Sequence, residues 1–266
     1  MAEPKTDIEL PKMEAATVLP GEELPEEDQK LAKRIDAQTA IGTGNPEIDK
    51  KMGGGIPLRS LTLIEGQPDA GKSVLAQQMV WGAVQSGFRT TMFTTENSVQ
   101  SLVRQMDSLG LDILDALLLD ELRIFPIRLQ EQKEDMKKAL GSLLYKMKRQ
   151  ENRDLIVVDS LTPFLSHISS DAGMSFIEQC KTLCDRGRSI VLTIHSYACD
   201  EGIMVRMESM CDAHLRLTIE EMGDKLIKSL VVAKVRGASK VTGNIVAFEV
   251  EPKMGMRIIP FSRARA

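Results

Sequence analysis

A glycine-rich stretch, Gly66-Gln67-Pro68-Asp69-Ala70-Gly71-Lys72-Ser73, matches the pattern G-x-x-x-x-G-K-[ST] at every constrained position. In this pattern the glycines let backbone N–H groups surround phosphate oxygens, and the following helix N-terminus adds about half a positive charge. Lys72 would reach the β- and γ-phosphates, and the Ser73 hydroxyl would ligate Mg²⁺. The alternative is a glycine-rich turn that matches by chance. The residues predicted to bind nucleotide are Gly66, Asp69, Ala70, Gly71, Lys72, Ser73 and Val74.

The segments on either side of this stretch are those that a phosphate-binding loop requires. Leu61 to Glu65 is short and apolar, which is typical of a buried strand, and helical spacing runs from Val74 to Ser86. The sequence therefore predicts a strand, a glycine loop and a helix in that order.

Two acidic residues follow later predicted strands. The apolar run from Leu155 to Val158 ends in Asp159, whose carboxylate could hold the hydration shell of Mg²⁺ at the end of a central parallel strand. Arg89 to Thr95 reads as another buried strand, and Glu96 stands at its tip, where a carboxylate can face the nucleotide. The alternatives are that Asp159 only caps its strand, and that Glu96 is a helix cap or an exposed acid.

The lead-in to the loop carries a family resemblance. The segment from Ile41 to Ser60 contains Gly53-Gly54-Gly55-Ile56-Pro57 and resembles the opening of RecA-superfamily domains of the KaiC-like branch. The resemblance extends from about residue 38 to the C-terminus. It implies a RecA-like P-loop α/β fold, with a mostly parallel central sheet flanked by helices and antiparallel C-terminal strands. We expect the three glycines to form a tight turn with positive φ.

The same resemblance assigns roles to further residues. In RecA-like ATPases the acid at the tip of the second strand polarises the attacking water, so Glu96 is the candidate general base. Many KaiC-like domains carry two consecutive acids there, whereas this chain has Asn97 next, which favours slow hydrolysis. His195 follows the strand Ser189–Ile194, where the fold places a γ-phosphate sensor; a structural hydrogen-bonding role is the alternative.

A K-x-R-G stretch near the C-terminus is also similar to one in KaiC-like domains. There the two cations contact the γ-phosphate bound by the neighbouring subunit. Period-two spacing places Lys234 and Arg236 on one face of a strand, as such a contact requires. Two exposed cations on a solvent face are the alternative.

The loop, the strand ending in Asp159 and the Lys234–Arg236 pair also resemble the FlaH family of archaellar motor ATP-binding proteins. That resemblance implies a nucleotide-dependent homo-oligomeric ring, with a hexamer as the first candidate. It further implies ATP and Mg²⁺ as ligands, and docking to the motor ATPase FlaI and to membrane-anchored scaffold proteins. The second hypothesis is a KaiC-like signalling ATPase that hydrolyses ATP at an appreciable rate, and the third is a RecA-like DNA recombination or repair ATPase.

Charge divides the chain into an acidic tail and a nearly neutral body. Residues 1–36 are rich in proline and contain ten acidic and five basic residues, a net charge of −5. The whole chain carries −4, so the remainder carries +1. We expect a disordered tail over 1–36 and one nucleotide-binding domain over 37–266. The neutral body, and an acidic loop over 197–211, argue against a nucleic-acid partner.

Hydropathy and cysteine spacing indicate the compartment. We find no apolar run near the roughly 18 residues needed to span a membrane, and no signal-peptide pattern, so we expect a cytoplasmic protein without membrane insertion. The four cysteines lack the spacing of a zinc site or a disulfide framework, which favours free buried thiols. Cys180 and Cys184 share a helix face, which leaves metal binding by these two thiols as the alternative.

Overall fold

The computed structural model describes residues 39–129, 136–222, 225–236 and 245–259. Its strands are β1 (Ala40–Ile41), β2 (Ile56–Pro57), β3 (Leu61–Gly66), β4 (Thr90–Thr94), β5 (Leu122–Pro126), β6 (Leu155–Asp159), β7 (Ser189–His195), β8 (Ala213–Met222), β9 (Lys225–Val235), β10 (Ile245–Glu251) and β11 (Gly255–Ile259). A nine-stranded sheet has the order β11-β10-β9-β8-β3-β7-β6-β4-β5, and β1 pairs with β2 separately. From β8 to β5 neighbouring strands are parallel, whereas β8 to β11 pair antiparallel.

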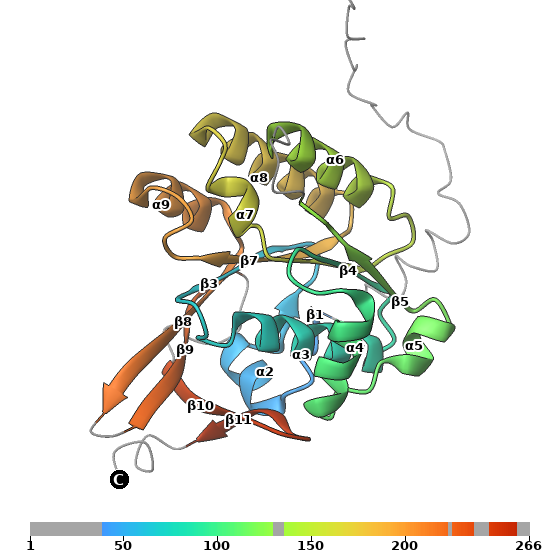
Figure 1. Cartoon of the computed structure of the whole chain (residues 1–266), viewed down its shortest axis with the longest axis vertical. Coiled ribbons are helices and arrows are strands. Elements are labelled where there is room, and N and C mark those ends of the chain that lie inside the picture. The colour runs from blue at the N-terminus through green and yellow to red at the C-terminus, as the bar shows by residue number, and fades with distance from the viewer. Residues whose placement is uncertain (1–38, 130–135, 223–224, 237–244, 260–266) are drawn as a thin grey trace, which may run out of the picture.

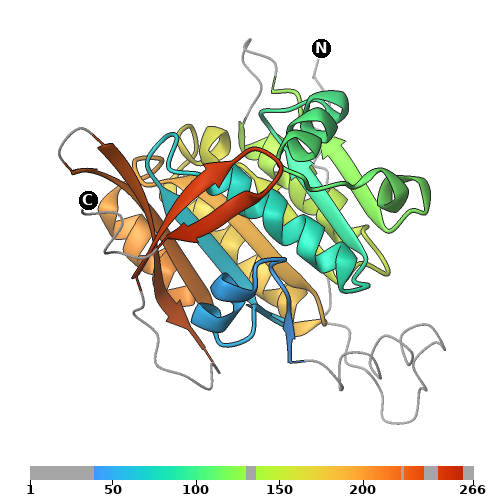
Figure 2. The same ribbon diagram turned by 90° about the horizontal axis from the view of Figure 1, so that it is seen from below.

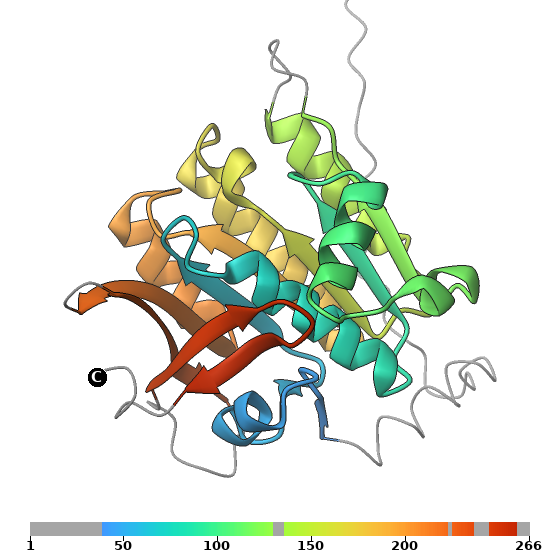
Figure 3. The ribbon, with the colours of Figure 1, turned by 60° about the horizontal axis from the view of Figure 1, so that its bottom comes forward.

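Helices cover both faces of the sheet (Figure 1). One face carries α6 (Met136–Lys148), α7 (Thr162–Leu165), α8 (Ser170–Asp185) and α9 (Glu201–Met210). The other carries α2 (Pro46–Met52), α3 (Lys72–Gln85), α4 (Val99–Ser108) and α5 (Leu114–Leu118). The β10–β11 hairpin lies along α3 on this second face (Figures 2 and 3).

The central strands are apolar because both of their faces are covered. Every residue of β3 is buried, and its side chains alternate between the two helical layers. Leu61 and Leu63 pack with α6 to α9, whereas Ile64 packs with α3. The parallel register then brings the carboxyl ends of β3, β4, β6 and β7 to one edge, with Thr94 opposite Asp159 and Gly66 opposite His195. Loops that leave this edge form the candidate site.

The structure confirms the predicted order of elements and adds details that the sequence did not predict. Strand β8 runs parallel to β3 because α9 carries the chain back across the sheet, so the C-terminal antiparallel set begins at the β8–β9 pair. Short helices α5 and α7 were not predicted, because five and four residues cannot display a helical period. Helix α6 is described from Met136, and residues 130–135 before it lie outside the described ones.

The triple glycine turn has the expected backbone. Gly53, Gly54 and Gly55 have φ values of 80°, 133° and 126°. A Cβ atom on Gly55 would lie 2.2 Å from the carbonyl oxygen of Ile41, so only glycine fits there. The predicted tail over 1–36 lies outside the described residues.

The four cysteines, all of them among the described residues, form no disulfide. Cys180, Cys184 and Cys211 are buried and Cys199 is half-buried. Burial raises the pKa of both Cys184 and Cys211 to about 12, so these two thiols stay protonated at neutral pH.

Candidate nucleotide-binding site

The glycine loop joins β3 to α3 in a geometry that leaves the helix N-terminus accessible to an anion. Gly66 lies against β8, where a Cβ atom would come 2.5 Å from the carbonyl oxygen of Leu217. Asp69 and Gly71 turn the chain with φ values of 58° and 97°. Gly71 is the N-cap of α3, and no side chain accepts a hydrogen bond there. No side chain therefore caps the first backbone N–H groups of α3, which can donate hydrogen bonds to a phosphate.

Lys72 lies at the base of this loop. Its side chain is buried, and Nζ donates to the carbonyl oxygen of Gln67 at 2.7 Å and lies 3.4 Å from Nδ1 of His195. Burial lowers the pKa of Lys72, against the attraction of Asp159 and Glu96. The charged ammonium is therefore held among acids in a partly desolvated place, where a phosphate would be a strong partner.

Asp159 is the most deeply buried acid of the site. It is 1% exposed, and its Oδ1 accepts hydrogen bonds from Ser73 Oγ at 3.2 Å and Thr193 Oγ1 at 2.6 Å. Its Oδ2 is buried without a hydrogen-bond partner. Burial raises the pKa of Asp159 to about 6, with a further contribution from the charge of Glu96.

The donor set around Asp159 fits a magnesium ion. A buried carboxylate oxygen without a partner and a neighbouring hydroxyl are hard oxygen ligands, as Mg²⁺ prefers. Ser73 and Asp159 would hold the ion, directly or through water, and the ion would offset the negative charge of bound phosphates.

These groups line one pocket with a volume of about 370 Å³. It is formed by the glycine loop, the tips of β4, β6 and β7, helix α4 and the β9 and β10 strands. The lining residues are Pro68, Asp69, Gly71, Lys72, Ser73, Val74, Glu96, Asn97, Gln105, Asp159, Ser160, His195, Lys228 and Val250. Gly66 and Ala70 shape the loop from behind, and Ala70 is fully buried.

Glu96 lies at the rim of the pocket. It is exposed, and its backbone N–H, like that of Asn97, points toward Thr94 Oγ1. The N-cap of α4 is Ser98, whose hydroxyl accepts from the N–H of Ser101, so Glu96 is not the helix cap. The other alternative, an exposed acid, agrees with the observed exposure of Glu96. A role for Glu96 as general base stays a prediction.

His195 also faces the pocket, from the tip of β7. Burial lowers its pKa, and the charge of Lys72 lowers it further, so the ring is neutral near pH 7. Its ring lies 5.2 Å from that of Tyr197. Both the sensor role and the structural role agree with this placement.

Lys234 and Arg236 lie elsewhere: Lys234 is near the end of β9, Arg236 directly follows β9, and both contact the last turn of α9. Lys234 Nζ donates to the carbonyl oxygens of Glu208 at 3.0 Å and Ser209 at 3.1 Å. Arg236 donates to the same Ser209 oxygen at 2.8 Å and approaches Asp212 at 3.5 Å. The two cations thus share a face, as period-two spacing predicts. A contact with a neighbouring subunit stays a prediction.

Comparisons with known proteins agree with this geometry. The family model described as "ATPase: KaiC" matches residues 41–263. The chain belongs to the KaiC family of ATPases. The resemblance of its glycine lead-in to this family is therefore confirmed, and nucleotide binding follows from the membership.

Relatives within the KaiC family include archaeal flagellar proteins. The archaeal flagellar ATP-binding protein FlaH of Sulfolobus acidocaldarius is 28% identical over 229 residues, covering 85% of this chain and 99% of that protein. FlaH of Methanocaldococcus jannaschii is 26% identical over 227 residues, covering 82% and 94%.

A solved structure, the flagellar accessory protein FlaH of Methanocaldococcus jannaschii, has a TM-score of 0.71 at 24% identity. It covers 80% of this chain and 95% of that one, a likeness that shows the shared fold. The predicted RecA-like α/β fold is thereby confirmed. Across the residues that the structure describes, we find no helix long and apolar enough to cross a membrane.

Sequence reasoning missed several residues of this KaiC-family site. Thr193 holds the carboxylate of Asp159, and Lys228 and Val250 reach the pocket from the C-terminal strands. No local pattern pointed to Lys228, because a β-bulge between Val232 and Lys234 puts Lys228 and Lys234 on opposite faces of β9, although period-two counting would put them on one. No pattern pointed to Thr193 either, because the sequence does not show which strands are neighbours.

Proposed function

We propose that this protein is an ATP-binding component of the archaellum motor, in which ATP·Mg²⁺ acts chiefly as an assembly ligand. One observation carries the proposal. Lys72, Ser73 and Asp159 converge in one pocket, whereas Lys234 and Arg236 lie against α9 in a different part of the same subunit. A subunit that binds nucleotide with the first group can therefore present the second group to a neighbour.

Mass action then links nucleotide to assembly. The trans contacts form only when a neighbour is present, so ATP favours the ring by the free energy of those contacts. The ring would dock the motor ATPase FlaI and a membrane-anchored scaffold, in the cytoplasm at the membrane-embedded motor. The resemblance to FlaH proteins supports this placement.

Slow hydrolysis is part of the proposal. Glu96 is the acid at the water-polarising position, and the neutral side chain of Asn97 follows it where many KaiC-like domains have a second acid. A single carboxylate that is exposed to solvent is less able to hold and orient an attacking water than a pair of acids.

Size-exclusion chromatography with light scattering tests the proposal. The wild-type protein with ATP·Mg²⁺ should elute as a larger assembly than without nucleotide. The Lys234→Ala/Arg236→Ala variant should keep its ATP affinity by calorimetry and lose that shift. Identical oligomer distributions for the two proteins would refute the proposal. Salt-dependent DNA binding by the wild type would favour the recombination reading instead.

A further inference from the structure

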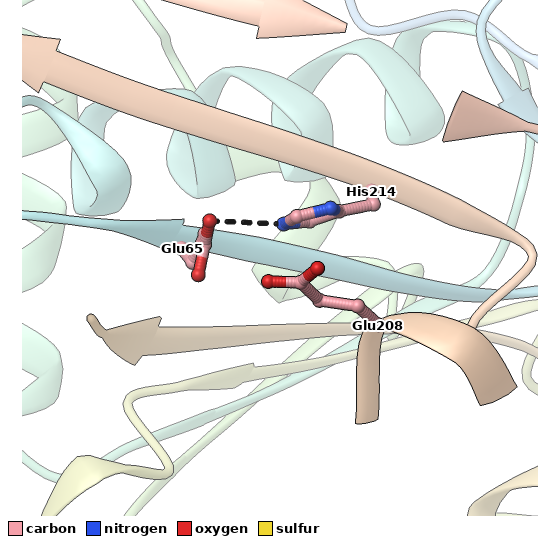
Figure 4. A group of neighbouring side chains, drawn as sticks. All are labelled: Glu65, Glu208 and His214. Carbon is pink, nitrogen blue, oxygen red and sulfur yellow. Dashed lines mark ion pairs between the residues drawn. The ribbon is translucent and has the colours of Figure 1, made fainter. Parts of the chain in front are cut away.

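A group of charged side chains lies directly behind the glycine loop. Glu65, the residue before Gly66, points toward His214 on β8 and Glu208 on α9 (Figure 4). Glu65 Oε1 lies 3.2 Å from Nε2 of His214, and both side chains are 4% exposed. The guanidinium of Arg216 bonds Glu65 through Nε and lies 3.4 Å from Oε1 of Glu208.

Arg216 determines the character of this group. The ligand atoms of Glu65, Glu208 and His214 lie within 4.8 Å of one another, close enough for a metal ion. The guanidinium already contacts both carboxylates, however, and supplies the positive charge that they need. Burial raises the pKa of Glu65, but His214 and Arg216 outweigh that effect and bring it below its usual value. The group is an ion-pair network.

The last turn of α9, which contains Glu208, also contacts the two cations Lys234 and Arg236. The side chain of Glu208 faces Arg216, while the carbonyl oxygens of Glu208 and Ser209 accept from Lys234, and that of Ser209 accepts from Arg236. A continuous set of polar contacts thus runs from the base of the glycine loop to the two cations. The α9 carbonyls and a neighbour's phosphate would compete for the same ammonium and guanidinium groups.

We propose that Arg216 and Glu208 are positioning residues that couple the glycine loop of a subunit to its own Lys234 and Arg236. Phosphate binding at the loop shifts the end of β3 and with it Glu65; Arg216 transmits the shift to Glu208 and to the last turn of α9. The last turn of α9 then releases Lys234 and Arg236, whose side chains can contact the phosphate bound by the next subunit. This inference rests on the proposed function, because it needs the two cations to act in trans.

The consequence is a measurable coupling between nucleotide and assembly. If bound ATP strengthens subunit association through this link, breaking the link should reduce that strengthening while leaving the nucleotide pocket intact. Neither Arg216 nor Glu208 lines the pocket, so the intrinsic affinity of a subunit for ATP should change little. A merely structural role would instead lower thermal stability and weaken association with and without ATP alike.

Mass photometry of the full chain, with and without ATP·Mg²⁺, tests the inference through Glu208→Gln, Arg216→Gln and the double variant. In each, the ATP-induced gain in association should fall about tenfold relative to wild type. ATP affinity, measured on dilute subunits, should stay within about twofold. The double variant should lose no more than the worse single variant, because both changes break one link. The matched control is Glu201→Gln, an exposed acid on the same helix.

Several outcomes would overturn the inference. A full ATP-induced gain in both single variants, or additive losses in the double variant, would show that no such link exists. If Arg216→Gln folds poorly, the Glu208→Gln variant alone tests the inference, because the Glu208 side chain is 26% exposed and its replacement should disturb folding less. One equivalent of Zn²⁺ bound by wild type and lost in His214→Gln would make the group a metal site and contradict the inference. A wild type that gains nothing from ATP would refute the proposed function itself, and the coupling with it.

Discussion

Replacing Asp159 by asparagine should make the nucleotide-free protein more stable while removing the carboxylate that would hold Mg²⁺. The native carboxylate is buried, and its pKa is raised from the usual 3.8 to about 6. The folded protein holds this proton more tightly than the unfolded chain does. The free energy of unfolding therefore falls as the pH rises from 3.8, the pKa in the unfolded chain, to about 6, the pKa in the folded protein. At neutral pH the cost is about 3 kcal/mol, from the 1.36 kcal/mol that corresponds to each pKa unit.

Asparagine avoids that cost and keeps the local contacts. Its side-chain oxygen can still accept from Ser73 and Thr193, while its NH2 group takes the place of the carboxylate oxygen that has no partner and, being buried there, offsets part of the gain. Asp159→Asn should therefore raise the free energy of unfolding by up to about 3 kcal/mol at about pH 7.5, and by about half as much at about pH 5. The melting temperature should rise by about 2–4 °C for each kcal/mol.

Urea unfolding of the nucleotide-free protein, followed by circular dichroism at both pH values, measures this effect. Asp185→Asn, which removes an exposed acid, is the matched control and should change stability by no more than about 0.5 kcal/mol. The same Asp159 variant should lose the magnesium dependence of ATP binding. An Asp159→Asn protein that is as stable as wild type, or less stable, at about pH 7.5 would refute the reasoning about the buried carboxylate.

Four further predictions concern the pocket. Lys72→Ala should weaken ATP binding at least about 100-fold by calorimetry, and unchanged affinity would refute the assignment of the loop. Lys228→Ala should weaken it about tenfold, whereas Lys50→Ala, an exposed control, should not; equal affinities would show that Lys228 only lines the rim. Gly71→Ala should lower affinity, because φ is 97° and its Cβ would meet the ring of Phe248 at 3.2 Å; wild-type affinity would contradict this. Glu96→Gln should leave a phosphate-release rate that is already low almost unchanged, and fast turnover that Glu96→Gln abolishes would favour the signalling ATPase.

The glycine loop and its strand and helix could be predicted because the motif has local causes. Glycine is required where φ is positive, and Lys72 and Ser73 follow at fixed spacing. That Asp159 meets Ser73 could also be predicted, because carboxyl ends of parallel strands share one edge.

Other parts of the site depend on tertiary structure. The partnership of Thr193 with Asp159 depends on β6 and β7 being neighbours in the register Val158 with Leu192. Lys228 reaches the pocket only because the C-terminal strands extend past the loop. The face shared by Lys234 and Arg236 followed from strand spacing, but their contact with α9 could not, since no local pattern links residues so far apart in the chain.

Subunit mixing tests the central claim most directly. Lys72→Ala should retain the cations but not bind ATP, and Lys234→Ala/Arg236→Ala should bind ATP but lack the cations. Each should remain monomeric with ATP·Mg²⁺ by mass photometry. An equimolar mixture should form an ATP-dependent heterodimer, because one subunit supplies the nucleotide and the other the contacts to it. A mixture that stays monomeric while wild type assembles would contradict the claim that the site is completed by the next subunit.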